Sequence, residues 1–356
     1  MGKGQGLRVG LLFNLKRVDP KATGDDAEAE FDSPNTVGAI AQAIASFGHT
    51  VVEIEATPHF PEAVRAANLD AAFNLSEGLH GRAREAVVPA VLDLVGIPYT
   101  GSDATTLALA LDKQLAKTVV RAAGVRTARS FVMRSGDQRV PRGFRYPLMV
   151  KPNAEGSSKG ITKNSVVHDE AELRKVAGGM IARYAQGALV EEFLPGREFT
   201  VGLLGDTRSP EVLPPMEIVF TNPADKHPIY SFEHKLDFTS DVRYDAPAQL
   251  TPALDRAVRR CAAKSYAALG CRDVSRIDLR LDAAGRPNFI EVNPLPGLTP
   301  DFSDLCLIAK SAGIDYVTLI GKILQPALDR VLEGRGAGGT AGARHAATPS
   351  RPAERP

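Results

Sequence analysis

The sequence predicts an α/β protein, α+β overall, with a parallel α/β domain at the N-terminus and two further domains after it. The chain has 356 residues, enough for two or three domains of roughly 100–200 residues each. Hydrophobic residues make up 44% of the chain and charged residues 24%, which are globular values and exclude a mostly disordered, collagen-like or coiled-coil protein. Over about the first 100 residues, strand-like and helix-like segments alternate, the pattern of a mostly parallel sheet.

The first predicted domain, residues 1–104, alternates strands and helices. Ser33 as a cap and Pro34 in the first turn predict a helix that ends at Gly48. Gly96 closes a second, amphipathic helix. In chain order the predicted elements are a strand at Arg8–Phe13, the helix from Ser33, strands at Thr50–Glu55 and Ala71–Asn74, and the helix at 85–95.

Two further domains are predicted over residues 105–194 and 195–332. The second has a helix at 105–123, strands at Ser130–Met133 and 148–151, a helix at 170–176 and a strand at Ala188–Glu192. The third has a strand at 198–204, a helix at Pro252–Leu269, two strands joined by a turn at 282–287, and an amphipathic helix around 317–332. The polar, proline-punctuated segment 221–248 lacks periodicity and is a candidate lid. Residues 333–356, rich in Gly, Ala, Pro and Arg, are expected to be disordered.

Charge, cysteine content and hydropathy exclude several classes of function. Forty-three Lys and Arg residues against 42 Asp and Glu leave a formal charge of +1, so no overall field favours nucleic acid or an anionic membrane. The cysteines Cys261, Cys271 and Cys306 are too few and too irregular for a disulfide framework or a tetrahedral zinc site. No signal peptide and no apolar run of roughly 20 residues is found. We therefore expect a cytoplasmic protein whose partners are small molecules.

The most informative segment is the predicted pair of strands that ends the third domain. Strand alternation puts Arg276 and Asp278 on one face of the first strand, and Glu291 and Asn293 on one face of the second. If the strands pair as a hairpin, Asp278, Glu291 and Asn293 converge with oxygen ligands only. Such a set suits Mg²⁺ that bridges substrate phosphates. The alternative is a solvent-exposed hairpin face that carries surface ions.

Other segments carry candidate nucleotide-binding residues. An apolar strand delivers Lys151 to a loop of small residues with Gly156, Ser157 and Ser158, whose donors can surround phosphate oxygens. An ordinary glycine-serine turn is the alternative. No Walker A sequence is present, and no G-x-G-x-x-G follows the first strand. Residues 189–198 place carboxylates at a strand end beside apolar residues, where either a nucleobase and ribose or only solvent would lie.

Taken in order, these segments resemble the D-alanine–D-alanine ligases, within the ATP-grasp superfamily of carboxylate-amine ligases. The resemblance runs from about residue 71 to residue 305, through His80-Gly-Arg, 96–102, Asp112-Lys113, Lys151-Pro with Gly156-Ser-Ser, 191–198, Arg276-Ile-Asp278, and Glu291-Val-Asn293 with Pro296-Gly297. It implies that residues 105–332 form a two-domain ATP-grasp unit. It also implies an ATP-dependent ligase of peptidoglycan precursor synthesis that joins two D-alanines through an acyl phosphate and releases ADP and phosphate. A homodimer is a further expectation from the resemblance.

The resemblance also implies roles for single residues. Lys113 and Lys151 would bind the ATP phosphates beneath a closing loop with Ser157 and Ser158, and two Mg²⁺ ions, or Mn²⁺, would be held by Asp278, Glu291 and Asn293. Adenine and ribose would contact Glu191, Leu194 and Glu198. The catalytic set would comprise Arg276, the backbone N–H of Gly297, Ser157, and Lys235 from the lid, which would also contact ATP.

Three departures from the family pattern fall at substrate-binding positions. The first strand does not lead into a Gly-Gly-x-Ser-x-Glu loop, and either Glu28 or Glu30 is a candidate to replace its glutamate. Leu236 stands where D-alanine-specific enzymes usually carry tyrosine, and the later serine is matched only by Phe302 or Ser303. A related ligase with another amino acid, hydroxy acid or peptide acceptor is therefore the second hypothesis. A non-catalytic ATP-binding protein is the third.

Overall fold

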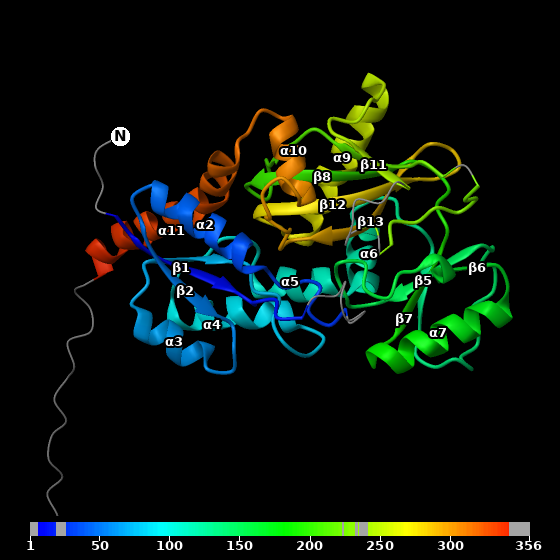
Figure 1. Ribbon diagram of the computed structural model, residues 1–356, viewed down its shortest axis with the longest axis horizontal. Coiled ribbons are helices and arrows are strands. Elements are labelled where there is room, and N and C mark those ends of the chain that lie inside the picture. The colour runs from blue at the N-terminus through cyan, green and yellow to red at the C-terminus, as the bar shows by residue number, and fades with distance from the viewer. Residues whose placement is uncertain (1–5, 19–25, 223, 232–233, 235–240, 342–356) are drawn as a thin grey trace, which may run out of the picture.

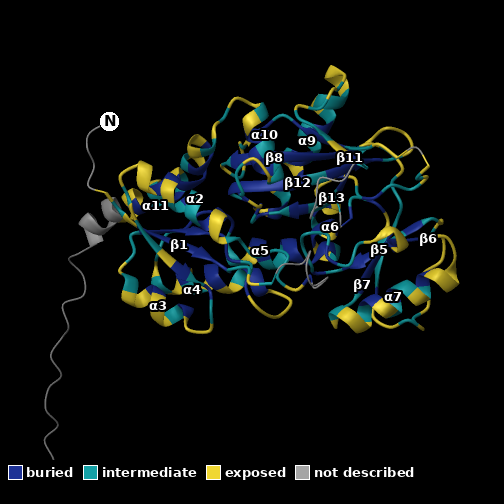
Figure 2. Cartoon of the chain, in the orientation of Figure 1, coloured by how far each residue is buried: buried dark blue, intermediate teal, exposed yellow. Residues whose placement is uncertain are grey.

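The computed structural model describes residues 6–18, 26–222, 224–231, 234 and 241–341, with side chains described as far as Gly334. Three sheets and their covering helices make up the molecule, which confirms the predicted mixed α/β class (Figure 1). The sheets draw on strands from residues 8–74, 130–192 and 198–293 in turn. Strands are mostly buried, and the exposed positions lie in the loops and on the outer faces of the helices (Figure 2). The predicted domain boundaries at 104 and 194 stay predictions.

The first sheet is parallel, with strand order β2-β1-β3. Its strands are β1 (Arg8–Phe13), β2 (Thr50–Glu55) and β3 (Ala71–Asn74), as predicted. The apolar faces of α2 (Pro34–Ser46) and α11 (Tyr316–Ala341) share one hydrophobic core with β1, while α3 (Phe60–Ala67) and α4 (Val87–Val95) pack in a second core on the opposite face. The predicted cap is confirmed, because the Ser33 side chain accepts a hydrogen bond from the Thr36 N–H. A 3-10 turn, η1 (Arg84–Ala86), comes directly before α4. At the other end of α4, Gly96 adopts the left-handed conformation and ends the helix.

The single helix predicted over 105–123 is wrong, because the chain forms two helices there, α5 (Ala104–Leu111) and α6 (Lys113–Ala122). The backbone of Asp112 is extended, which separates the two helices. The Asp112 side chain caps α6 by accepting a hydrogen bond from the Leu115 N–H at 3.0 Å. The helical period runs through both segments, so the sequence pattern does not reveal the break. Its consequence is that Lys113 occupies the first position of a helix and not a surface in mid-helix.

The second sheet is antiparallel and has four strands. Its order is β4 (Ser130–Met133), β7 (Ala188–Glu192), β5 (Leu148–Pro152) and β6 (Val166–Val167), and α7 (Glu170–Tyr184) covers it. The helix predicted for 170–176 continues to Tyr184, because packing against the sheet sustains it through Gly178 and Gly179, where propensity is poor. In Figure 1 this unit stands apart from the first sheet, with α5 and α6 between them.

The third sheet is antiparallel with order β11-β10-β8-β12-β13, and β9 pairs with β8. Its strands are β8 (Glu198–Gly205), β9 (Glu211–Val212), β10 (Met216–Phe220), β11 (Val242–Asp245), β12 (Asp273–Leu281) and β13 (Pro287–Asn293). On one face α9 (Pro252–Leu269) packs against Val201 and Leu203. On the other, α10 (Asp304–Ser311) approaches so closely that a Cβ on Gly202 would lie 2.6 Å from Leu305.

Several predictions for the third domain need correction. Segment 221–248 is not wholly irregular, because β11 lies inside it and pairs with β10. The last helix continues to Ala341, so residues 333–341 are helical and not disordered as predicted; residues 342–356 lie outside the described ranges. The predicted lid residues Lys235 and Leu236 also lie outside them. Within the described ranges, no helix has both the length and the apolar character needed to cross a membrane.

Candidate active site

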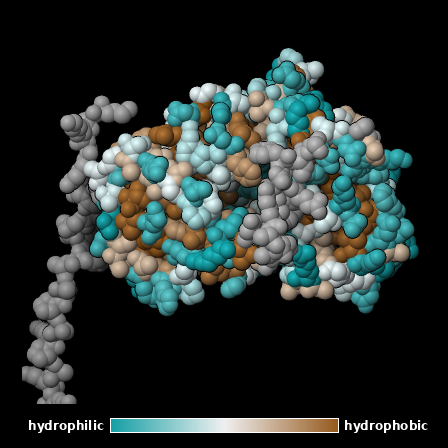
Figure 3. Space-filling view, in the orientation of Figure 1, coloured by the Kyte–Doolittle hydropathy of each residue, from teal (hydrophilic) through white to brown (hydrophobic). Residues whose placement is uncertain are grey.

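Two adjacent cavities lie where the three sheets meet. A central cavity of about 380 Å³ lies between the loops of the first sheet and the β12–β13 hairpin. A smaller strand pocket of about 80 Å³ is lined by β5, β7, β8, β12 and β13. Tyr230, Arg276 and Asp304 line both, so they form the shared wall. Figure 3 shows the surface hollowed where the first sheet faces the hairpin.

The β12–β13 hairpin brings the predicted metal ligands together. The strands pair antiparallel, with Asp278 opposite Glu291 and Arg276 opposite Asn293, and a bulge follows Asp278. The Asn293 amide donates to the Asp278 carboxylate at 3.0 Å. Three oxygen-bearing side chains therefore lie together on one side of the hairpin, as the alternation of residues predicts. This donor set fits a hard divalent cation.

Arg276 is held by two carboxylates at the wall between the cavities. Its guanidinium donates two hydrogen bonds of 3.1 Å to Asp278 and lies 3.2 Å from Asp304, at the start of α10. The side chain is buried, so its orientation is set by these partners and not by solvent. Gly297 lines the central cavity nearby, and a Cβ there would lie 2.9 Å from the Ser303 hydroxyl.

A buried ion-pair cluster joins α6 to the second sheet. Glu191 on β7 lies 2.5 Å from the Lys117 ammonium and 2.8 Å from that of Lys151. Burial by itself would raise the pKa of Glu191, but the two lysine charges outweigh it and lower this pKa to about 2. Glu191 thus stays ionised and holds Lys151 at the edge of the strand pocket.

Lys117 is a residue that the sequence analysis missed. It lies one helical turn after Lys113, so the i, i+4 spacing was the available signal. Lys113 itself lies 3.2 Å from Glu291 and donates to the Glu155 carbonyl. The backbone N–H of Lys113 donates to the Asn153 carbonyl at 2.9 Å, which ties the start of α6 to the loop after β5.

The loop after β5 has the backbone of a tight turn. Ser157 and Ser158 have φ of 48° and 56°, in the left-handed region that side chains other than glycine rarely adopt. The Gly156 N–H donates to Glu30 at 2.6 Å, and a Cβ on Gly156 would lie 2.2 Å from the same oxygen. A side chain at this position would therefore displace the Glu30 carboxylate. Ser157 faces the central cavity and Ser158 the strand pocket.

The contact between Gly156 and Glu30 also distinguishes between the two candidate glutamates of the first domain, Glu28 and Glu30. Glu30 lines the central cavity. Glu28 instead accepts hydrogen bonds from the backbone N–H groups of Arg17 and Val18, at 2.6 and 2.7 Å. Of the two, Glu30 is the one the structure brings to the site.

The strand pocket combines an apolar lining with a buried ion pair. Leu194 and Phe193 line it together with isoleucines of the third sheet. Glu198 lies 3.0 Å from Arg280, whose guanidinium also stacks over the Phe193 ring at 4.8 Å. Burial raises the pKa of Glu198, although Arg280 acts in the opposite direction. Arg280 was not identified from the sequence; it follows Asp278 by two residues and so shares its face of β12.

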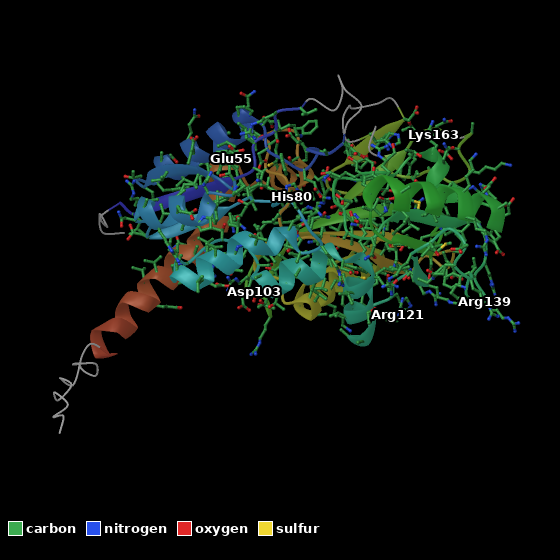
Figure 4. All side chains as sticks on the ribbon, turned by 90° about the horizontal axis from the view of Figure 1, so that it is seen from below. Glu55, His80, Asp103, Arg121, Arg139 and Lys163 are labelled. Carbon is green, nitrogen blue, oxygen red and sulfur yellow. The ribbon has the colours of Figure 1, made fainter. Side chains whose placement is uncertain are left out.

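All the predicted site residues that the structure describes line one of the two cavities. In the central cavity are Lys113, Ser157, Arg276, Asn293 and Gly297. In the strand pocket are Lys151, Ser158, Glu191, Leu194, Glu198, Asp278, Glu291 and again Arg276. Lys235 lies outside the described residues. His80, part of one matched motif, is exposed and lines a separate outer groove (Figure 4).

The family model described as "D-ala D-ala ligase C-terminus" matches residues 117–325, more than half of the chain. The chain belongs to the D-alanine–D-alanine ligase family. The resemblance seen in the sequence motifs is thereby confirmed.

Relatives of this ligase family extend the match over most of the chain. A protein of Sinorhizobium fredii, named only as uncharacterized protein y4sG, is 38% identical over 72% of this chain and 74% of its own length. A D-alanine–D-alanine ligase of Geobacter sulfurreducens is 35% identical over 85% of this chain and 90% of its own. The structure of the D-alanine–D-alanine ligase of Bacillus anthracis complexed with ATP superposes with a TM-score of 0.71 at 22% identity, covering 92% of this chain and all of that one. This last likeness shows the shared fold.

Proposed function

We propose that this protein is an ATP-dependent ligase that joins two D-alanines through an acyl phosphate and releases ADP and phosphate. The observation that carries the proposal is the position of Arg276, on the wall between a pocket suited to a nucleotide and a cavity suited to small polar substrates. A group at this wall can contact both a transferred phosphoryl group and the carboxyl carbon that receives it. Ligases of this name among the relatives support the assignment.

The strand pocket is the proposed ATP site. Its apolar lining, with Leu194, suits adenine, and Glu198 suits the ribose hydroxyls. Lys113 and Lys151 would bind the phosphates beneath the backbone of the Ser157–Ser158 turn. Asp278, Glu291 and Asn293 would hold two Mg²⁺ or Mn²⁺ ions. The bound ions would neutralise phosphate charge, which is most of what phosphoryl transfer requires from a protein.

The reaction then follows from the positions of the charged groups. A carboxylate oxygen of the first amino acid attacks the γ-phosphorus, and the bond to ADP breaks. The uncharged amine of the second amino acid attacks the acyl carbon, and phosphate leaves with the bonding electrons. Arg276 and the Gly297 N–H stabilise the oxyanion formed in between.

Three further elements belong to this proposal. Segment 221–248 would close over the site and exclude water from the acyl phosphate, and Lys235 would come from it. Tyr230 and Tyr244, whose hydroxyls lie 2.6 Å apart, would form its inner wall. We also propose a homodimer that works in the cytoplasm, where ATP and the precursors of peptidoglycan are available.

A second candidate has an observation in its favour. The wall of the central cavity carries several carboxylates around Glu30, which a pair of methyl side chains does not require. A related ligase that uses another amino acid at one position therefore remains the alternative.

The direct test is phosphate release from ATP in the presence of Mg²⁺ and D-alanine, with the product identified by mass spectrometry. D-alanyl-D-alanine is the expected product, and L-alanine serves as the control substrate. Release of phosphate only with another amino acid would replace the leading proposal with the alternative. No phosphate release with any amino acid or hydroxy acid would reject ligase activity altogether.

A further inference from the structure

Arg280 is a buried cation of the strand pocket to which the proposed reaction gives no role. Its side chain is 5% exposed and lines the pocket that is proposed for ATP. In the antiparallel pairing of β12 with β8, Arg280 lies directly opposite Glu198. Side chains that stand opposite each other in a sheet project from the same face, so the two groups meet at the pocket.

Contacts from three segments fix the guanidinium of Arg280. Its Nε donates to the Gly196 carbonyl at 3.1 Å, in the loop before β8. One Nη donates to Glu198 at 3.0 Å, and the other donates at 2.8 Å to the Pro228 carbonyl, in the proposed lid. The guanidinium also lies over two aromatic rings, 4.8 Å from the centroid of Phe193 and 5.5 Å from that of Phe220. A guanidinium with all of these partners is held in one orientation, and it fixes the carboxylate that it contacts.

The Glu198 carboxylate keeps one oxygen for a ligand. Arg280 donates to Oε2, whereas Oε1 accepts no hydrogen bond from any residue in the described ranges. Glu198 is 8% exposed and lines the strand pocket, so a ligand in that pocket is the available partner for Oε1. An ionised carboxylate accepts hydrogen bonds and donates none, so it suits a ligand that carries hydroxyl donors. The ribose of ATP has two such hydroxyls.

We infer that Arg280 is a positioning residue for the nucleotide, which holds Glu198 so that its free oxygen accepts a hydrogen bond from a ribose hydroxyl. This inference rests on the proposed ATP site in the strand pocket and identifies what makes that site select the sugar. A carboxylate buried this deeply is unfavourable without a cation beside it. Arg280 supplies the cation from the side of Oε2 and leaves Oε1 open.

No other cation of the pocket takes this place. Within the described ranges, Glu198 forms an ion pair with Arg280 alone. The other two cations that line the pocket are held by other carboxylates, Lys151 by Glu191 and Arg276 by Asp278 and Asp304. The orientation of Glu198 therefore depends on Arg280.

The contacts of Arg280 also favour an indirect role over direct binding of a phosphate group. Each of its three nitrogens already donates to a protein oxygen, and its charge is paired with Glu198. A phosphate on Arg280 would have to displace these partners. A ribose hydroxyl at Oε1 leaves all of them in place.

The first test measures nucleotide binding to the unaltered protein, with no amino acid present. Isothermal titration calorimetry in Mg²⁺ compares ATP with 2′-deoxy-ATP, 3′-deoxy-ATP and 2′,3′-dideoxy-ATP. We expect ATP to bind roughly 10-fold or more tightly than the dideoxy nucleotide, the factor expected for a hydrogen bond to a charged group. The two monodeoxy nucleotides show which hydroxyl Glu198 contacts.

The second test follows the same ratio of affinities in variants of Arg280. Arg280→Met keeps much of the side-chain length but removes the charge and the donors, so the ratio should fall to roughly threefold or less. Arg280→Lys keeps the charge without the planar fork and should recover part of the ratio. The matched control is Arg259→Met on α9, where the arginine pairs with Asp255 and donates to the Val212 carbonyl at 2.9 Å. This control should keep the wild-type ratio.

A double variant separates positioning from loss of folding. Arg280→Met leaves Glu198 buried without its cation, which destabilises the protein. Combining it with Glu198→Gln removes both charges and is expected to restore the thermal stability, while the ratio of affinities stays low. Because both residues act through one contact, the double variant should lower the ratio no further than either single variant.

The outcomes separate this inference from the proposed function. Equal affinity of the wild-type protein for ATP and 2′,3′-dideoxy-ATP would overturn the inference, while the ATP site would stand. A wild-type ratio in Arg280→Met, or an equal fall of the ratio in Arg259→Met, would overturn it as well, because either result shows a merely structural role. Selective binding of ATP without phosphate release for any amino acid would support the inference and reject the ligase proposal. Absence of ATP binding to the wild-type protein would reject the proposed nucleotide site itself.

Discussion

At the residue scale, the site depends on charges that are buried in pairs. Glu191 is almost fully buried, and its two partners come from α6 and β5. Such a pair gives little net stability compared with apolar residues, but removing one member leaves an uncompensated charge inside the protein. The cluster therefore fixes the position of Lys151 more than it stabilises the fold.

Replacing Glu191 tests this argument. Glu191→Gln leaves two buried lysines unpaired and is expected to lower the free energy of unfolding by about 3–5 kcal/mol at neutral pH. Because the folded pKa of Glu191, about 2, lies below its ordinary value of 4.5, the stability from this group is present above pH 4.5 and is lost as the pH falls toward 2. The difference between wild type and variant in urea unfolding should shrink over this range. A difference that is constant from pH 7 to pH 2 would contradict the ion-pair explanation.

Arg276 gives a prediction about chemistry at the same scale. Arg276→Ala removes a donor to the proposed oxyanion and is expected to lower kcat by roughly 10²–10³, with the KM for ATP nearly unchanged. Arg276→Lys keeps the charge but loses the planar fork that contacts Asp278 twice, so it should recover only part of the loss. The control is Arg286→Ala, at the exposed turn of the same hairpin, where the arginine pairs with Asp282 and Ala should leave kcat unaltered. An unchanged kcat in Arg276→Ala would refute its proposed role.

At the element scale, the break between α5 and α6 decides where Lys113 lies. Asp112 ends one helix, caps the next, and accepts from Arg82 at 2.7 Å. If α5 and α6 formed one continuous helix, the regular spacing of 3.6 residues per turn would fix the direction of the Lys113 side chain, and that direction would be away from Glu291. The proposed phosphate contact therefore depends on a helix cap.

The role of the Asp112 cap of α6 can be tested by comparison with Asp103, which caps the preceding helix, α5. Asp112→Ala should cost about 1 kcal/mol of stability and raise the KM for ATP by roughly fivefold, since Lys113 follows directly. Asp103 caps α5 through the Thr106 N–H at 2.9 Å and lies at the start of that helix in Figure 4. Asp103→Ala should cost similar stability in thermal unfolding and leave the KM for ATP unchanged. Equal effects of both variants on KM would show that the break has no special role.

At the scale of the whole molecule, α11 connects the end of the chain to both the first and the third sheet. Arg330 on α11 lies 2.5 Å from the buried Asp273 of β12 and donates to the Tyr99 carbonyl at 2.6 Å. Asp273 in turn accepts from the Gly101 N–H at 2.9 Å. One guanidinium thus holds two units of the molecule together, while the chain is exposed from Leu332 to Gly334.

Shortening the chain distinguishes the two parts of this helix. A chain that ends at Glu333 should keep full turnover and stability, because the helix is already exposed from Leu332 to Gly334, where the chain is cut. Arg330→Met should lower the free energy of unfolding by about 3–5 kcal/mol, since it leaves Asp273 buried without its cation. Both are measured by chemical denaturation together with phosphate release. Loss of activity in the shortened chain would assign a role to the exposed end of α11.

Much of this protein follows from its sequence because the relevant signals are local. Ser33, Gly96 and the strand alternation at Arg276 and Asp278 predict elements and faces that the structure confirms. The alternation also predicts that Asp278, Glu291 and Asn293 converge, since both strands of a hairpin lie close together in sequence. Short motifs of this kind were sufficient to identify the ligase family.

Only the tertiary structure decided how the charges are paired. Lys117 meets Glu191 from 74 residues away, and Arg280 meets Glu198 from 82 residues away, so no local pattern shows these contacts. The sequence by itself determined which chemistry the chain contains, because propensity and periodicity act over a few residues. Packing determined which charges pair with one another, because electrostatic compensation depends on distance in space.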